Sequence, residues 1–189
     1  MNDNVTMGNA LPVHPEYLKM REQMLTKTAD ELKIINMPDD KTCAYGAVID
    51  MALDGRIMTL VCYFNGEVSM LYSTGGAVAG LGQHYPNVRE QAKVMLASIG
   101  QAAHLFAEPK DFALPGGTYN HVYLLTNKGK LFIRLNPRTI TAEPRERQFV
   151  FMLYNRVMNE VTKIMPQVMH AQRSVTPVQF FPNRKDGNK

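Results

Sequence analysis

Two dipeptides constrain the fold of this chain more than any other feature: Asp54-Gly55 and Asn65-Gly66, each between runs of apolar residues. A type I′ hairpin turn needs positive φ at both central positions, and Asp-Gly and Asn-Gly meet this need with little strain. The pattern therefore predicts three antiparallel strands over residues 44–53, 56–64 and 67–73. Such a meander argues against a parallel βαβ unit in the same part of the chain.

Helical periodicity predicts three helices around this meander, over residues 15–35, 86–107 and 144–165, with Pro166 disfavouring helix just beyond the last of them. A further hairpin is expected over residues 121–135. The element order is then α-βββ-α-ββ-α, an α+β fold with a five-stranded antiparallel sheet packed with helices. The expected buried stripe is Leu18, Leu25, Ala29 and Leu32 on the first helix, and Phe149, Met152, Leu153, Val157, Val161 and Ile164 on the last.

The length of 189 residues fits one domain, which we place at residues 14–170. Residues 1–13 are expected to form a disordered N-terminal arm, and residues 171–189 a basic flexible C-terminal tail. No apolar run approaches the roughly 20 residues that a membrane-spanning helix needs. The N-terminus lacks the pattern of a secretory signal, and two cysteines make no disulfide framework, so we expect a cytoplasmic location.

Basic residues concentrate in the last third of the chain. Residues 109–189 hold 13 basic and 5 acidic side chains, whereas residues 1–43 hold 5 and 7, and residues 44–108 hold 3 and 5. The densest group is Lys128, Lys130, Arg134, Arg138, Arg145 and Arg147. Lys130 and Arg134 point to one side of their strand with Phe132 between them, a pattern that can bind nucleic acid or an acidic protein. A solvated outer face is the favoured interpretation, because no nucleic-acid-binding fold signature accompanies the charge.

The stretch 73–84, STGGAVAGLGQH, places four glycines between a strand and a helix, where phosphate-binding loops also lie. Gly82 is followed by Gln83 and His84 rather than by the Lys-Ser/Thr pair of a P-loop, and the last glycine of the dinucleotide fingerprint is missing. We therefore expect a corner in which glycine supplies unusual φ angles. A ligand or partner contact stays open for Gly75, Gly76, Gly80, Gly82 and His84.

The remaining polar residues give no catalytic or metal-binding signature. No histidine lies at metal-ligand spacing from another histidine or a cysteine, so neither a metal nor another cofactor is expected. Cys62 alternates with apolar residues and is expected in the core, while Cys43 precedes a strand and is open to exposure. Asp50 interrupts an apolar strand, and we expect it at a sheet edge or facing solvent.

The element order over about residues 15–165 resembles that of small bacterial type III secretion chaperones, which are dimeric binding proteins. The resemblance rests on element order and not on a motif, and that family is generally acidic whereas this chain has a net charge of +4. We expect a non-enzymatic bacterial protein that binds another macromolecule, chaperone- or adaptor-like, as a homodimer. One alternative is a small-molecule or anion-binding protein or enzyme using the glycine-rich loop, with His84 and Arg134 or Arg138 converging on one pocket. The other is nucleic-acid binding through the basic C-terminal third.

Overall fold

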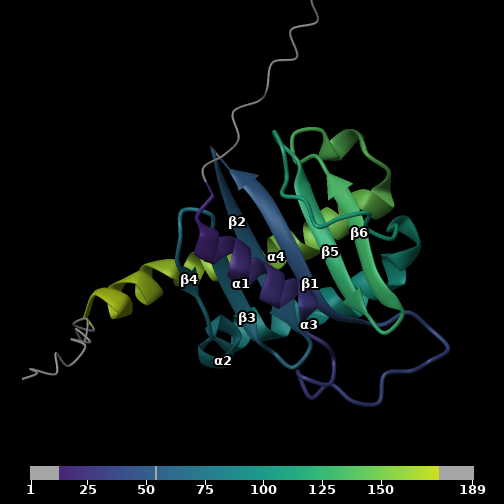
Figure 1. Ribbon diagram of the computed structural model, residues 1–189, viewed down its shortest axis with the longest axis horizontal. Helices are drawn as coiled ribbons and strands as arrows, with labels where there is room; N and C mark the ends of the chain where they lie inside the picture. The colour runs from purple at the N-terminus through teal and green to yellow at the C-terminus, as the bar shows by residue number, and fades with distance from the viewer. Residues whose placement is uncertain (1–12, 54, 175–189) are drawn as a thin grey trace, which may run out of the picture.

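The computed structural model of the chain describes residues 13–53 and 55–174, in which helices cover both faces of one antiparallel sheet (Figure 1). The expected N-terminal arm lies outside the described residues apart from Val13. Of the expected C-terminal tail, residues 171–174 continue the last helix and residues 175–189 lie outside the described part.

The sheet has six strands in the order β4-β3-β2-β1-β5-β6. Their bounds are β1 Ala44–Leu53, β2 Arg56–Tyr63, β3 Val68–Tyr72, β4 Ala77–Val78, β5 Asn120–Thr126 and β6 Gly129–Leu135. All five pairings are antiparallel, so the α+β fold and the antiparallel meander are confirmed. The type I′ turn expected at Asn65-Gly66 is wrong, because Gly66 has φ of +95° but Asn65 has no positive φ, and the turn also takes in Phe64. The expected count of five strands was wrong by one. The additional strand, β4, forms because Gly75 and Gly76 adopt φ of +97° and +90° and turn the chain back against β3.

The helical elements are α1 Pro15–Thr26, α2 Leu81–His84, α3 Pro86–Ile99, η1 Gly100–Leu105, η2 Ile140–Ala142 and α4 Arg145–Ser174, where η denotes a 3-10 helix. Helices α3 and α4 pack together on one face of the sheet, and α1 lies across the other (Figure 1). Both faces of the sheet are thus covered by helices of the same chain. No described helix combines the length and the apolar character needed to cross a membrane.

Helix α1 is shorter than the predicted helix over residues 15–35. It ends at Thr26 because Lys27 turns to an extended conformation, and Thr28 and Glu31 then form a separate turn in which the Glu31 carboxylate accepts from the Thr28 backbone N–H at 2.7 Å. Its buried face also differs, since Tyr17, Arg21 and Leu25 are buried whereas Leu18 is 45% exposed. The helix is turned so that Tyr17 and Arg21 meet polar groups on the sheet, which apolar periodicity alone does not reveal.

Helix α4 continues past Pro166, where the sequence predicted its end. A proline inside a helix removes one backbone hydrogen bond. Packing continues beyond it, because Val168 is 8% exposed and belongs to the main core. The expected stripe holds for Leu153, Val157 and Val161, whereas Phe149 and Met152 are 38% and 37% exposed.

Candidate functional site

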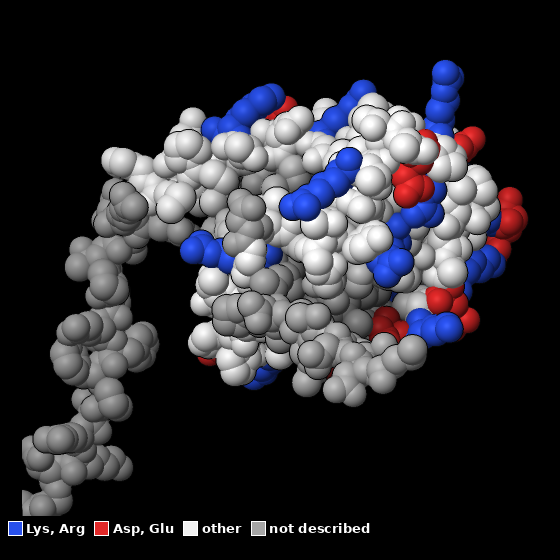
Figure 2. Space-filling model, turned by 90° about the horizontal axis from the view of Figure 1, so that it is seen from above, with Lys and Arg blue, Asp and Glu red and all other residues white. Residues whose placement is uncertain are grey.

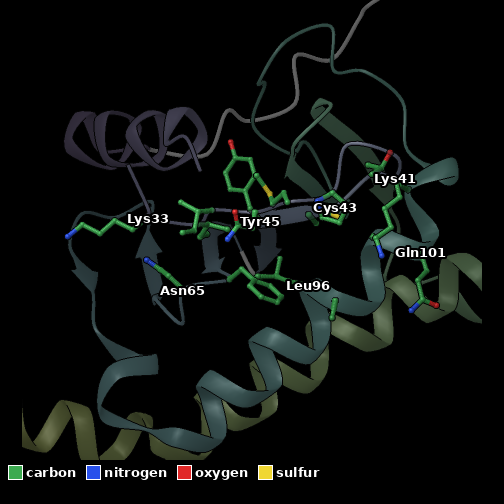
Figure 3. Close-up of a pocket in the computed structure, with 18 of the residues that line it drawn as sticks. Lys33, Lys41, Cys43, Tyr45, Asn65, Leu96 and Gln101 are labelled. Atoms are coloured by element: carbon green, nitrogen blue, oxygen red, sulfur yellow. The ribbon is translucent and has the colours of Figure 1, made fainter. Parts of the chain in front are cut away.

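A hollow of about 850 Å³ lies between the connection from α1 to β1 and the C-terminal half of α3 (Figure 3). We call residues 27–43, which form that connection, the linker, and we call the hollow the linker groove. Its walls come from the linker, the start of β1, the β2–β3 turn, α3 and η1. Most lining side chains are apolar, among them Ile34, Ile35, Met37, Phe64, Leu96 and Ala97. Size and lining are typical of binding sites in proteins.

Two asparagines fix the path of the linker from both ends. Asn65, in the β2–β3 turn, donates a hydrogen bond from its side-chain Nδ2 to the carbonyl oxygen of Leu32 at 3.4 Å. Asn127, in the β5–β6 turn, donates from Nδ2 to the carbonyl oxygens of Pro38 at 2.7 Å and Lys41 at 3.0 Å. Both turns belong to the sheet, so the sheet holds the linker above α3 and thereby keeps the groove in place.

The backbone between these two anchors is turned sharply at two positions. Lys33 and Asn36 have φ of 56° and 62°, and no other described non-glycine residue has positive φ. The left-handed region is costly for residues with a side chain, although asparagine tolerates it better than most. The two turns place Ile34 against the core beneath α1 and leave Ile35 74% exposed. Both turned residues line the groove.

The groove has a buried apolar floor and an exposed apolar rim. Leu96 on α3 is 1% exposed and forms part of the floor, whereas Phe64 at the rim is 42% exposed and Ile35 is exposed further still. Soluble proteins seldom gather exposed apolar residues around a hollow unless something binds there. This arrangement therefore marks the linker groove as the candidate functional site.

A few polar groups border the apolar part of the groove. Lys33 and Lys41 lie at its opposite ends in Figure 3, and Gln101 and His104 enter from η1. Tyr45 also lines the groove, and its hydroxyl donates to the carbonyl oxygen of Lys27 at 3.1 Å. Burial raises the pKa of the Tyr45 hydroxyl, so this group stays protonated and acts as a donor. No carboxylate lines the groove within the described residues.

A second hollow adjoins the groove, because Gln101 and His104 line both. It measures about 410 Å³ and reaches the first turn of α4, where Arg145, Glu146 and the exposed ring of Phe149 line it. The two hollows together form an elongated surface that runs from the linker across η1 to α4.

The groove offers contact surface rather than a reactive constellation. Across residues 13–53 and 55–174, no three His, Cys, Asp or Glu side chains gather in a way that would hold a metal ion. Cys43 lines the groove, whereas Cys62 lies fully buried elsewhere in the core, where burial raises the pKa of its thiol and keeps it protonated. The chemistry available in the groove is therefore apolar packing, hydrogen bonding and charge.

The structure places the glycine-rich loop away from the groove. Gly75 and Gly76 form the β3–β4 turn, and Gly80 precedes α2 with φ of +75°. Gly82 packs so closely on the β2–β3 turn that an added Cβ would lie 2.1 Å from the carbonyl oxygen of Gly66. His84 ends α2, which packs near the β3 side of the sheet. None of these five residues lines the linker groove.

The basic residues come from three parts of the chain, which are the β5–β6 hairpin, the connection before η2 and the start of α4. Lys130 and Arg134 do lie on one side of β6, where each cation sits over an aromatic ring, Lys130 Nζ 5.3 Å from the centroid of Phe112 and the Arg134 guanidinium carbon 4.3 Å from that of Tyr119. Arg147 pairs with Glu143 at 2.7 Å. Figure 2 shows Lys and Arg standing apart from one another on the face it presents.

The other three residues of the basic group, Lys128, Arg138 and Arg145, lie on different elements. Lys128 in the β5–β6 turn donates to the carbonyl oxygen of Asp39, Arg138 lies in the connection before η2, and Arg145 lines the second hollow. Because β4 and β6 are opposite edges of the sheet, His84 is not brought together with Arg134. The convergence on one pocket that the small-molecule alternative requires is absent from the hollows described above.

Asp50 corrects a sequence-based expectation. It is fully buried on the central strand β1 rather than at an edge, and its carboxylate accepts from Arg21 Nη2 at 2.6 Å, Arg21 Nε at 2.9 Å and Thr59 Oγ1 at 2.7 Å. Arg21 Nη1 also donates to the carbonyl oxygen of Phe112 at 2.8 Å. The Thr59 hydroxyl shares a 2.7 Å hydrogen bond with the hydroxyl of Tyr17. This network fastens α1 to the sheet and lies outside the groove.

Comparison with protein-family models, with curated proteins and with solved structures finds no match to this chain. The groove is therefore interpreted from its own geometry. Sequence reasoning missed its residues because the first part of the linker, residues 27–35, was assigned to the first helix. The available signal was the pair Ile34-Ile35 close to Pro38, since two large apolar residues near a helix breaker need a partner outside that helix.

Proposed function

We propose that this chain is a non-enzymatic binding protein that holds an apolar segment of another protein in the linker groove. The observation that carries the proposal is the exposed rim, where Ile35 at 74% and Phe64 at 42% stand beside a hollow with an apolar floor. An apolar centre bordered by polar and charged side chains is the ordinary anatomy of a protein interface.

A macromolecular partner fits this surface better than a small molecule does. A small ligand is largely enclosed by its pocket, and a ligand on the floor of this groove would leave Ile35 in water. The second hollow extends the same surface to Phe149 on α4. A polypeptide segment is long enough to lie along this extended surface.

The proposal is tested by native mass spectrometry of the tagged full chain purified from the cells that naturally make it. Ile35→Asp places a charge on the groove rim, and Val94→Asp places the same charge at another exposed apolar residue, 47% accessible on α3 and outside the groove. Both sites are exposed, so both variants should fold, since surface substitutions change stability by about 0.5 kcal/mol or less.

We expect a partner chain that remains with the native protein and with Val94→Asp and is lost from Ile35→Asp. Partners retained equally by all three proteins would contradict the proposal. The same spectra test the expected homodimer: a mass of two chains that disappears only in Ile35→Asp would mean that the occupant of the groove is a second copy.

A further inference from the structure

We infer that the partner segment is an acidic amphipathic helix, with its apolar face on Ile35, Phe64 and Ala97 and its carboxylates near Lys33 and Lys41. The inference rests on the proposed function and specifies the chemistry of the partner at the same groove.

The first step concerns the backbone of the partner. The groove is lined by the beginning of β1, and the β2–β3 turn contributes Phe64 and Asn65. Strands β1 and β2 are both paired on both sides, so no free edge of the sheet that the structure describes lies beside the groove. An added strand therefore finds no backbone to pair with, and recognition must come from side chains. A helix satisfies its own backbone hydrogen bonds and presents side chains at i, i+3, i+4 and i+7, which suits an elongated apolar hollow.

The two outer edges of the sheet, β6 and β4, are also unsuited to pairing with an added strand. Phe132 already exchanges backbone hydrogen bonds with Ala107, at 2.7 and 3.0 Å, and the carbonyl oxygen of Arg134 accepts from the Arg147 side chain. The opposite edge is the two-residue strand β4. Both edges of the sheet are thus poor sites for strand addition, as is common in proteins that avoid edge-to-edge pairing.

The second step concerns charge. The groove and the adjoining hollow are lined by Lys33, Lys41 and Arg145, against the single carboxylate of Glu146. Neither lysine forms an ion pair with a described residue. The four linker carboxylates, Asp30, Glu31, Asp39 and Asp40, do not line the groove. The cations around the apolar floor are therefore available to carboxylates of a partner.

The positions of the two lysines determine where the carboxylates of the partner must lie. In Figure 3, Lys33 extends outward at one end of the groove, and Lys41 descends from the linker toward α3 at the other, near Gln101. The apolar side chains occupy the space between them. A helix lying along the groove meets a cation at each end, so acidic residues flanking an apolar face complement both.

The test uses three designed peptides of about 18 residues, roughly 27 Å long as helices. All carry Leu at the apolar positions, and the polar positions are filled with Glu, Gln or Lys. Affinities for the full chain are measured by fluorescence anisotropy at low and high salt. Exposed ion pairs each change an affinity by up to about fivefold, so we expect the Glu peptide to bind about fivefold tighter than the Gln peptide at low salt. This preference should shrink as salt screens the charges.

The decisive protein variant is the double charge reversal Lys33→Glu/Lys41→Glu. It should weaken binding of the Glu peptide and strengthen binding of the Lys peptide, a reversal that damage to the fold cannot produce. The matched control is Lys19→Glu/Lys110→Glu, which changes the net charge equally at two exposed lysines that line neither hollow. This control should keep the original order of affinities.

The outcomes separate the two proposals. Equal binding of all three peptides, lost in Ile35→Asp, would overturn the inference about charge and leave the proposed function standing. Failure of every peptide to bind would overturn both. An order of affinities that reverses in the control as well would attribute the preference to overall charge and overturn the assignment to Lys33 and Lys41.

Discussion

Arg21→Met should destabilise this protein far more than a substitution in an exposed ion pair. Asp50 is 0% exposed and Arg21 is 5% exposed, so removal of the guanidinium leaves a carboxylate buried without a counter-ion. Breaking a buried pair in this way costs about 3–5 kcal/mol. Native domains are stable by about 5–15 kcal/mol, so the change removes a large part of the total. For a chain of this size it corresponds to a fall in melting temperature of about 6–20 °C.

The matched control is Lys27→Met. Lys27 and Glu67 also join the α1 side to the sheet, at 3.2 Å, but their side chains are 33% and 37% exposed. An exposed pair contributes about 0.2–1 kcal/mol. The double variant Arg21→Met/Asp50→Asn removes both charges and retains an amide oxygen that can accept from Thr59, so it should recover much of the lost stability.

Urea unfolding followed by circular dichroism gives the free energies of unfolding of the native chain, Arg21→Met, Asp50→Asn, their double variant and Lys27→Met, provided that the slope with denaturant is unchanged between variants. We expect the free energy of unfolding lost in Arg21→Met/Asp50→Asn to be smaller than the sum of the losses in Arg21→Met and in Asp50→Asn, by about 2 kcal/mol or more. Equal costs for Arg21→Met and Lys27→Met would refute it. Additivity of the two single losses would refute it as well.

Two further predictions concern stability and its dependence on pH. Gly82→Ala should lower the free energy of unfolding in urea by about 1–3 kcal/mol, because the new Cβ would lie 2.1 Å from the Gly66 carbonyl oxygen. Gly116→Ala is the control, and it should be neutral or slightly stabilising because the space around Gly116 is open. Equal effects of the two substitutions would contradict the close packing of Gly82. Burial lowers the pKa of His121, whose Nδ1 lies 3.0 Å from the Ala113 carbonyl oxygen, so the unfolded chain takes up the proton more readily. The free energy of unfolding should therefore fall as the pH drops below about 6.5. Urea midpoints measured at pH 7 and pH 5 should differ less in His121→Gln than in the native chain. Parallel pH profiles of the two proteins would contradict this role of His121.

The linker groove shows why a candidate site can escape a sequence-based analysis. The predicted helix over residues 15–35 included Lys33, Ile34 and Ile35, which line the groove. The linker is instead held by Asn65 and Asn127, and Asn127 lies 89 residues from Pro38 and 86 from Lys41. An asparagine in a hairpin turn reads as a turn residue, and nothing local indicates that its side chain also binds a distant carbonyl. The site depends on contacts between segments that only the folded chain brings together.

The elements that sequence predicted well are those whose information is local. Asp54-Gly55 and the alternating strands around it specify a two-residue turn and its register, and the structure pairs Leu53 with Arg56 accordingly. Asn65-Gly66 correctly marks the next turn, but Phe64 joins that turn, so Cys62 pairs with Val68 instead of Ser69. The helix α3 likewise follows from the spacing of its apolar residues, which are buried against the sheet. Backbone φ requirements and side-chain periodicity act within one segment, so they are legible in the sequence.

Tertiary structure alone decided which polar residues are buried and what the linker does. Asp50 resembles a solvent-facing residue in the sequence, yet Arg21 arrives from α1 and neutralises it on a central strand. The order of strands then sets β4 and β6 at opposite edges, which separates His84 from Arg134. These outcomes depend on which segments pack together, and the free energy of such packing belongs to the pair of segments and not to either sequence alone.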